Sequence, residues 1–251
     1  MSGHSKWSTI KRKKGAADAK RGQLFTKIIK EITVAARMGG DDLNSNTRLK
    51  TAVTKAKINN MPNDNIERAI KKGMGTLEGE TYEEVRYEGY GPGGIAIMLD
   101  CLTDNKNRTT PEIRTIFNKN NGNLGETGCV GFLFDKKGMI IIDGQKTSED
   151  DILELLMDYD IEDIKTEDKN IQVVTKPESY NEIYDTLKSK QYTLIYNEIT
   201  FIPKSTVQLD EKKAAQCLKM IELLEDHEDV QNVYSNYDIT DEIMEKISEV
   251  K

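Results

Sequence analysis

The spacing of apolar residues follows a helical period over the first third of the chain and strand-like periods after it. Over 16–38, apolar residues recur every three or four positions and predict a helix that ends at Gly39. A second helix is predicted over about 46–59, and a third over 62–73, with Pro62 at a favourable first position. Residues 2–15 show no apolar period, so we expect them to lie extended when free.

The later part of the chain contains one pattern of strands and helices twice, with one copy interrupting the other. In the inner copy, Ser148 and Asp151 form a capping-box signature at the start of its first helix. The order of elements is βαββαβ, the ferredoxin-like unit. Its predicted strands lie at 139–143, 161–166, 170–175 and 197–202, and its helices at 149–159 and 178–189.

The outer copy is split around the inner one. A strand–helix–strand tail cannot bury its faces alone, so we expect it to complete a second βαββαβ unit with the segment before the insertion. Its predicted elements are a strand at 94–102, a helix at 111–120 and a strand at 129–134, followed after the insertion by a strand at 205–209, a helix at 211–225 and a strand at 229–235.

These patterns predict a multidomain α+β fold. An N-terminal three-helix domain is followed by two ferredoxin-like βαββαβ domains, one inserted in the other. The expected domains are residues 1–76 for the basic arm and helices, 77–134 plus 204–251 for the discontinuous α+β domain, and 135–203 for the inserted domain.

The balance of charged residues changes at about the same position as the spacing of the apolar residues. Residues 1–75 contain 17 Lys and Arg against 6 Asp and Glu, whereas residues 76–251 contain 19 against 37. The overall net charge of −7 hides this asymmetry. A strongly basic end indicates a polyanion partner, and the acidic remainder favours solubility.

The candidate nucleic-acid contacts of the first part form two groups. Those of the arm precede the first acid at Asp18, and Trp7 among them either stacks on a base or pins the arm to the first helix. Those of the first helix are spaced so that most share one face. The residues that we expect to contact nucleic acid here are Lys6, Trp7, Lys11, Arg12, Lys13, Lys14, Lys20, Arg21, Lys27, Lys30 and Arg37.

One loop of the acidic part adds two candidates. The segment 103–109 delivers Lys106 and Arg108 to a helix N-terminus, where free N–H groups favour anions. The alternative is an ordinary capped loop. The glycine-rich segment 89–94 lacks the ending of a phosphate loop and is better explained as a tight turn.

Catalysis, metals and membranes find little support in the sequence. His4 and His227 lie far apart without a nucleophile signature, and the Cys and His clusters of a zinc site are missing. Three widely spaced cysteines and the absence of an apolar leader or span predict a reduced, cytoplasmic protein. We therefore expect no enzyme activity, no cofactor, no metal and no membrane partner.

Seven motifs in matching order give the chain a resemblance to the YebC/PmpR family. They are Gly3–Trp7, Asp18–Gly22 with Phe25–Lys27, Asn60–Pro62, Asp64–Gly73, Glu88–Gly94, Thr103–Thr109 and Gly122–Gly125. The resemblance implies a helical first domain and two α+β domains. Cys129 and Asn121 depart from the Ser and Gly usual in the family, and the arm is more basic than usual.

The function implied is nucleic-acid-binding regulation of gene expression. Family members are described as probable DNA-binding transcriptional regulators, and the second and third helices suit a helix-turn-helix. The alternative is a ribosomal-RNA-binding translation factor, because the family includes a mitochondrial translational activator and a basic arm with one aromatic residue suits folded RNA. No dimer seam is visible, so a monomer is expected.

Overall fold

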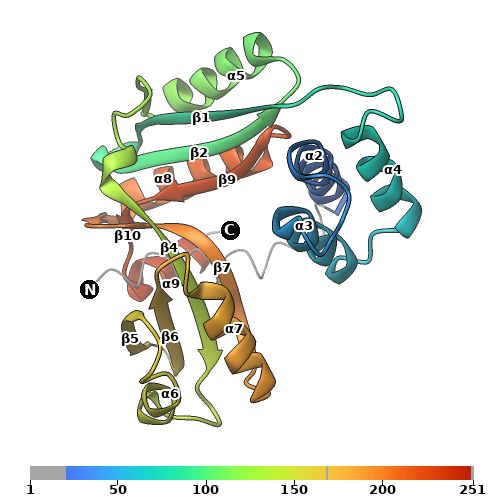
Figure 1. Ribbon diagram of the computed structural model, residues 1–251. Helices are drawn as coiled ribbons and strands as arrows, with labels where there is room; N and C mark the ends of the chain where they lie inside the picture. The colour runs from blue at the N-terminus through green and yellow to red at the C-terminus, as the bar shows by residue number, and fades with distance from the viewer. Residues whose placement is uncertain (1–20, 168, 250–251) are drawn as a thin grey trace. The chain divides into compact units, whose positions relative to one another are not determined.

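The computed structural model describes residues 21–167 and 169–249 (Figure 1). Among these residues, 132–206 form one compact unit, and residues 21–131 together with 207–249 form the other. We call the first the inserted unit and the second the outer unit. The α+β fold class predicted from the sequence is confirmed, whereas the division into three domains stays a prediction.

The outer unit begins with three helices around one apolar core. They are α2 (Arg21–Gly39), α3 (Thr47–Ile58) and α4 (Asn63–Gly73). Ile32, Leu49 and Ala56 are among the buried residues at its centre. Gly73 allows α4 to approach α2 closely, because a Cβ there would lie 2.4 Å from the carbonyl oxygen of Thr33. All three helices thus lie close to the bounds predicted from the spacing of apolar residues and from the two glycines after Met38.

The rest of the outer unit is built around a four-stranded antiparallel sheet. Its strands, in spatial order, are β3 (Asn123–Leu124), β1 (Glu83–Tyr90), β2 (Ala96–Thr103) and β9 (Val230–Ser235). Helices α5 (Lys106–Lys119) and α8 (Glu211–Asp226) bury Phe117 and Leu224 in one core with the sheet residues Leu99 and Val233. Helix α9 (Asp241–Glu249) packs partly against this core through Ile243.

Two strands predicted for the outer sheet are not part of it. Residues 129–134 contain the 3₁₀ turn η2 (Gly131–Leu133), because the Glu88 carboxylate accepts the N–H groups of Val130 and Gly131 at 2.8 and 2.6 Å. Near 205–209 only β8 (Val207–Gln208) forms, and it pairs in parallel with β10 (Tyr237–Asp238) in a separate two-stranded sheet.

Strand β1, which the sequence pattern did not predict, completes the outer sheet. In a ferredoxin-like unit the first and third strands are the two central ones. Here β2 is the first strand, and its central neighbour β1 comes from the chain before it, paired from Glu83–Thr103 to Tyr90–Ala96. The spatial arrangement is retained while the third strand has a different origin in sequence.

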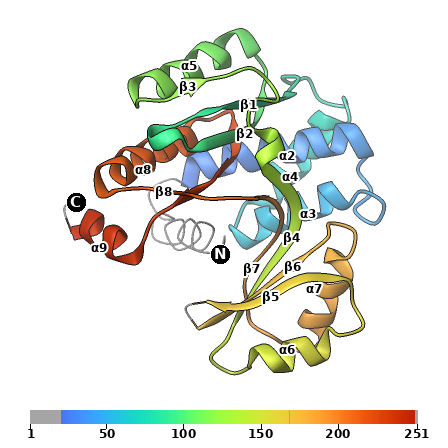
Figure 2. The same cartoon turned by 90° about the vertical axis from the view of Figure 1, so that its left-hand side faces the viewer.

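The inserted unit has the predicted βαββαβ order (Figure 2). Its sheet order is β5-β6-β4-β7, all antiparallel. Both helices contribute to the core with Ile140 and Ile142 of β4, so they cover the same face, and Ser148 and Asp151 form the predicted capping box. The elements are β4 (Phe134–Asp143), α6 (Glu149–Leu155), β5 (Ile161–Glu167), β6 (Asn170–Thr175), α7 (Tyr180–Ser189) and β7 (Leu194–Pro203).

The glycine-rich segment before β2 is a tight turn, as predicted. It contains the 3₁₀ turn η1 (Pro92–Gly94), with Gly93 and Gly94 at φ values of 80° and 79°. Such positive φ values favour glycine. Within the described residues, no helix is both long and apolar enough to span a membrane.

Candidate nucleic-acid interface

The cations of α2 that were expected to face nucleic acid mostly point into the protein's own structure. Lys27 Nζ donates a hydrogen bond to the carbonyl oxygen of Glu225 at 2.5 Å. Lys30 is only 5% exposed, and Arg37 alone among the three is fully on the surface, with a long contact to Thr81. Lys6, Trp7, Lys11, Arg12, Lys13, Lys14 and Lys20 lie outside the described residues, and Arg21 is the first residue of α2.

Lys30 is buried because it pairs with a buried carboxylate from the far end of the sequence. Asp229 follows α8 and is 0% exposed. Its Oδ1 lies 2.5 Å from Lys30 Nζ, and its Oδ2 accepts from Arg108 Nη2 at 2.9 Å and from Thr109 Oγ1 at 2.7 Å. Two predicted nucleic-acid ligands from separate motifs therefore converge on one acid. We call these four residues the Asp229 cluster.

Electrostatics within the Asp229 cluster favour permanent ionisation. Burial by itself raises the pKa of Asp229, but the hydrogen bonds from Lys30, Thr109 and Arg108 outweigh it and hold the pKa at about 2. The hydrogen bond to Asp229 likewise raises the pKa of Arg108 above its usual value. Asp229 and Arg108 therefore both stay charged across the physiological pH range.

The loop before α5 is a capped helix start, the second of the two interpretations of segment 103–109. The Asn105 side chain accepts the Arg108 N–H at 3.2 Å, and Thr103 Oγ1 shares a 2.7 Å hydrogen bond with Thr109 Oγ1. Arg108 also donates to Asp104 at 2.9 Å. Of the two cations predicted here to bind an anion, only Lys106 is exposed and has no ion pair with a described residue.

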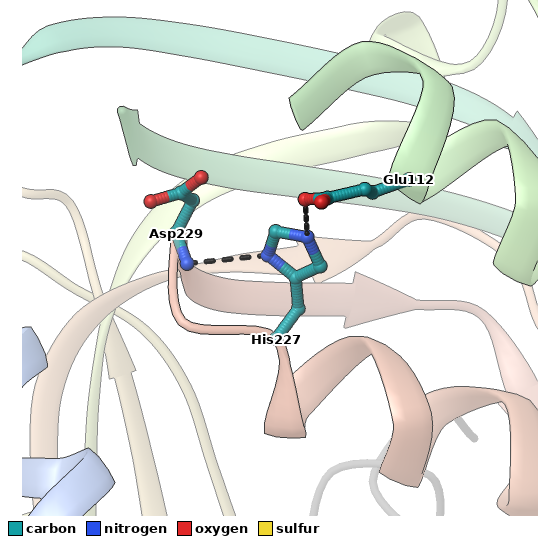
Figure 3. A group of neighbouring side chains, drawn as sticks. All are labelled: Glu112, His227 and Asp229. Atoms are coloured by element: carbon teal, nitrogen blue, oxygen red, sulfur yellow. Dashed lines mark hydrogen bonds and ion pairs between the residues drawn. The ribbon is translucent and has the colours of Figure 1, made fainter. Parts of the chain in front are cut away.

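Asp229 also lies close to Glu112 and His227, and the three residues bring possible metal-ligand atoms within 4.8 Å of one another (Figure 3). His227 Nδ1 accepts the Asp229 backbone N–H at 3.2 Å, which leaves Nε2 to donate to Glu112 at 3.0 Å. Both ring nitrogens are thus engaged, and Lys30 and Arg108 already neutralise the Asp229 carboxylate. The donor set fits a hydrogen-bonded network, not a cation site.

The cysteines of the chain do not have the surroundings of nucleophiles. None of the three forms a disulfide, and Cys101 and Cys217 are buried. Burial raises the pKa of Cys101 to about 12 and also raises the pKa of Cys129. A nucleophilic cysteine needs the opposite shift.

Helix α3 carries a basic face that the sequence analysis did not include among its candidates. The helix contains no Asp or Glu, and Lys50, Lys55 and Lys57 are all exposed. No acid of the described residues forms an ion pair with any of them. Lys50 and Lys57 lie about two turns apart and therefore on the same side, with Thr54 exposed between them. Lys55 is also exposed but lies on another side of the helix. We call the exposed surface formed by Lys50, Thr54, Lys55 and Lys57 the α3 face.

The neighbouring helices lack this property. Helix α4 interleaves its cations with Asp64 and Glu67, as ordinary solvated helices do. Helix α2 carries Glu31, which pairs with Arg48 of α3 through two hydrogen bonds of 2.7 and 3.1 Å. A stretch of 12 helical residues without an acid is visible in the sequence, so counting acids per helix would have found the α3 face.

Comparison with known proteins shows the family. Residues 5–76 match the model of the TACO1/YebC protein N-terminal domain, and residues 82–237 match the model of the TACO1/YebC second and third domain. The chain therefore belongs to the TACO1/YebC family, as its motifs predicted.

Full-length relatives agree with this assignment. A protein of Syntrophus aciditrophicus is 57% identical over 99% of this chain and 100% of the relative, and one of Geobacter sulfurreducens is 53% identical over 98% and 100%. Both are called probable transcriptional regulatory proteins. The crystal structure of a conserved hypothetical protein from Aquifex aeolicus is 46% identical, with a TM-score of 0.79 over 90% of this chain and 94% of that one.

Proposed function

We propose that the protein is a non-enzymatic regulator of gene expression that binds nucleic acid through the α3 face. The observation that carries the proposal is an exposed helix with three lysines and no acid, in a chain whose net charge is −7. In such a chain, an acid-free basic helix attracts a polyanion while the remainder repels it. Exposed Thr54 adds a hydroxyl of the kind that contacts phosphate oxygens.

Duplex DNA is the polyanion that the relatives favour, because those compared are called probable transcriptional regulatory proteins. The first helix of the expected helix-turn-helix pair, not the second, carries the acid-free face. The alternative of a ribosome-bound translation factor finds no support in the names of these relatives and stays a prediction. So does the part assigned to the arm and to Trp7.

The test is the salt dependence of binding. Fluorescence anisotropy with labelled duplex DNA, duplex RNA and single-stranded RNA compares the wild type with the triple variant Lys50→Gln, Lys55→Gln, Lys57→Gln. For each phosphate that the variant no longer neutralises, we expect the log–log salt slope to flatten by about 0.9 on duplex DNA and by about 0.7 on single strands. Affinity at low salt should fall with it.

A matched control removes the same charge elsewhere. Lys136, Lys146 and Lys190 are exposed lysines of the inserted unit, and changing all three to Gln should leave the slope unchanged. Equal slopes for the α3 triple variant and the wild type on every nucleic acid would contradict the proposal. A steeper dependence on duplex RNA than on DNA would favour the translational alternative.

A further inference from the structure

The outer unit contains two apolar cores that do not merge. One lies among α2, α3 and α4, and the other lies between the sheet and the helices α5 and α8. Among the described residues the two cores share no member. Residues 74–81, which join the helices to β1, are all exposed. Val34 of α2 is buried outside both cores. The two cores themselves therefore do not join the helical part to the sheet.

Hydrogen bonds from lysines of α2 join the two parts. Lys30 Nζ reaches Asp229 at 2.5 Å and the carbonyl oxygen of Glu228 at 3.3 Å, while Lys27 reaches the carbonyl oxygen of Glu225. The last turn of α8 has no basic residue of its own. The lysines of α2 thus supply the cations that a helix C-terminus attracts.

The joining segment is drawn into the same contact. Lys30 Nζ also lies 5.5 Å from the centroid of the Tyr82 ring, at the end of the exposed residues before β1. A cation over an aromatic face is attracted by the ring quadrupole. Lys30 therefore contacts both the joining segment and the sheet.

One further ion pair joins the same two parts but is exposed. Arg48 Nη2 of α3 lies 2.6 Å from Glu84 of β1, with side chains 36% and 52% exposed. Exposed pairs contribute little to stability, because solvent screens them. This pair offers a control in which an ionic interaction between the same parts is removed without opening a buried site.

We propose that Lys30, Asp229 and Arg108 form a lock that makes the helical part and the sheet one rigid body. Parts joined by an exposed linker and separate cores are expected to move relative to one another unless something fixes them. Here a carboxylate without exposed surface is held from both sides, by Lys30 of α2 and by Arg108 and Thr109 of α5. The consequence is that the α3 face is presented in one orientation relative to the sheet.

The proposal does not depend on nucleic-acid binding, and its test needs none. Backbone ¹⁵N relaxation of the full-length protein at neutral pH gives the rotational correlation time of the helical part and of the outer sheet. In the wild type we expect one common value. Lys30→Met removes the α2 side of the lock and leaves Asp229 paired with Arg108 and Thr109, so the sheet should stay folded while the helical part tumbles with a shorter correlation time of its own.

The matched control is Glu84→Gln, which breaks the exposed pair and should leave the common correlation time unchanged. Asp229→Asn gives a second variant, since it removes the charge that both cations share and should also separate the two values. The lock is refuted if the helical part and the sheet keep one correlation time in Lys30→Met and in Asp229→Asn while both variants remain folded. It is equally refuted if Glu84→Gln separates them as much as Lys30→Met does.

Discussion

Helices α2 and α3 carry similar positive charge in sequence but use it in opposite ways. Lys27 and Lys30 of α2 turn towards the carbonyl end of α8 and the Asp229 carboxylate, whereas Lys50 and Lys57 of α3 face solvent. The partner of Lys30 lies 199 residues away in the chain. A basic helix face is thus a candidate for nucleic acid only when no acid from a distant segment reaches it.

The largest loss of stability should come from breaking the buried ion pair between Lys30 and Asp229. Lys30→Met leaves Asp229 short of one cation, and breaking a buried pair costs about 3 kcal/mol or more. Chemical denaturation should show this loss in the free energy of unfolding. Lys50→Met, on the exposed helix, should change it by less than about 0.5 kcal/mol. Equal effects of the two substitutions would remove the distinction between the helices.

Acid should weaken the wild type through Asp229. Its pKa is lowered from 3.8 to about 2 in the folded protein, so the stabilisation is complete above pH 4 and is lost as the pH falls through 2. The difference in unfolding free energy between the wild type and Asp229→Asn should therefore shrink by roughly 2 kcal/mol between pH 5 and pH 2. A difference that stays constant over this range would mean that Asp229 titrates normally.

A smaller loss is expected when Arg108 keeps its charge but loses its shape. Its guanidinium donates to Asp104 and Asp229 together, which a lysine ammonium does less well. Arg108→Lys should cost about 1 kcal/mol in thermal or chemical unfolding, within the range for a typical intramolecular hydrogen bond. Full retention of stability would show that only the charge matters at this site.

The smallest effect should be that of Lys106, two residues away. It is exposed and has no ion pair with a described residue, so Lys106→Ala should alter stability by less than about 0.5 kcal/mol. If Lys106 contacts a phosphate, the same substitution should flatten the salt slope of binding by at most about 0.9. Lys106 and Arg108 then show within one loop the same contrast between an exposed and an internally paired cation that α3 and α2 show.

The elements that the sequence predicted well are those with a strong local period. The three helices and the whole inserted unit follow from apolar spacing, from the glycines after α2 and from the Ser148–Asp151 capping box. Strand β1 was not predicted, because its glutamates and Gly89 are poor strand formers. Its pairing with β2 supplies the stabilisation that its composition does not. Tertiary pairing outweighed local preference there.

The candidate site was harder to predict for a related reason. Lys27, Lys30 and Arg108 were predicted to contact nucleic acid, but the acid and the carbonyl groups that engage them come from 225–229, which no local pattern connects to α2. The α3 face, in contrast, needs no distant information, because its defining property is a local absence of acids. The sequence therefore indicates the charge of a helix more reliably than the direction in which that charge faces.

The wide separation between Lys30 and Asp229 also bears on how the protein folds during synthesis. The inserted unit is made of neighbouring segments and can form early, whereas β2 must wait for β9, with Ile97 pairing to Ser235. Until the ribosome has passed residue 229, the carboxylate that Lys30 binds in the finished protein has not yet been made. In that interval we expect the newly made basic end to bind polyanions most strongly. It should bind them less strongly once β9 has been made and has paired.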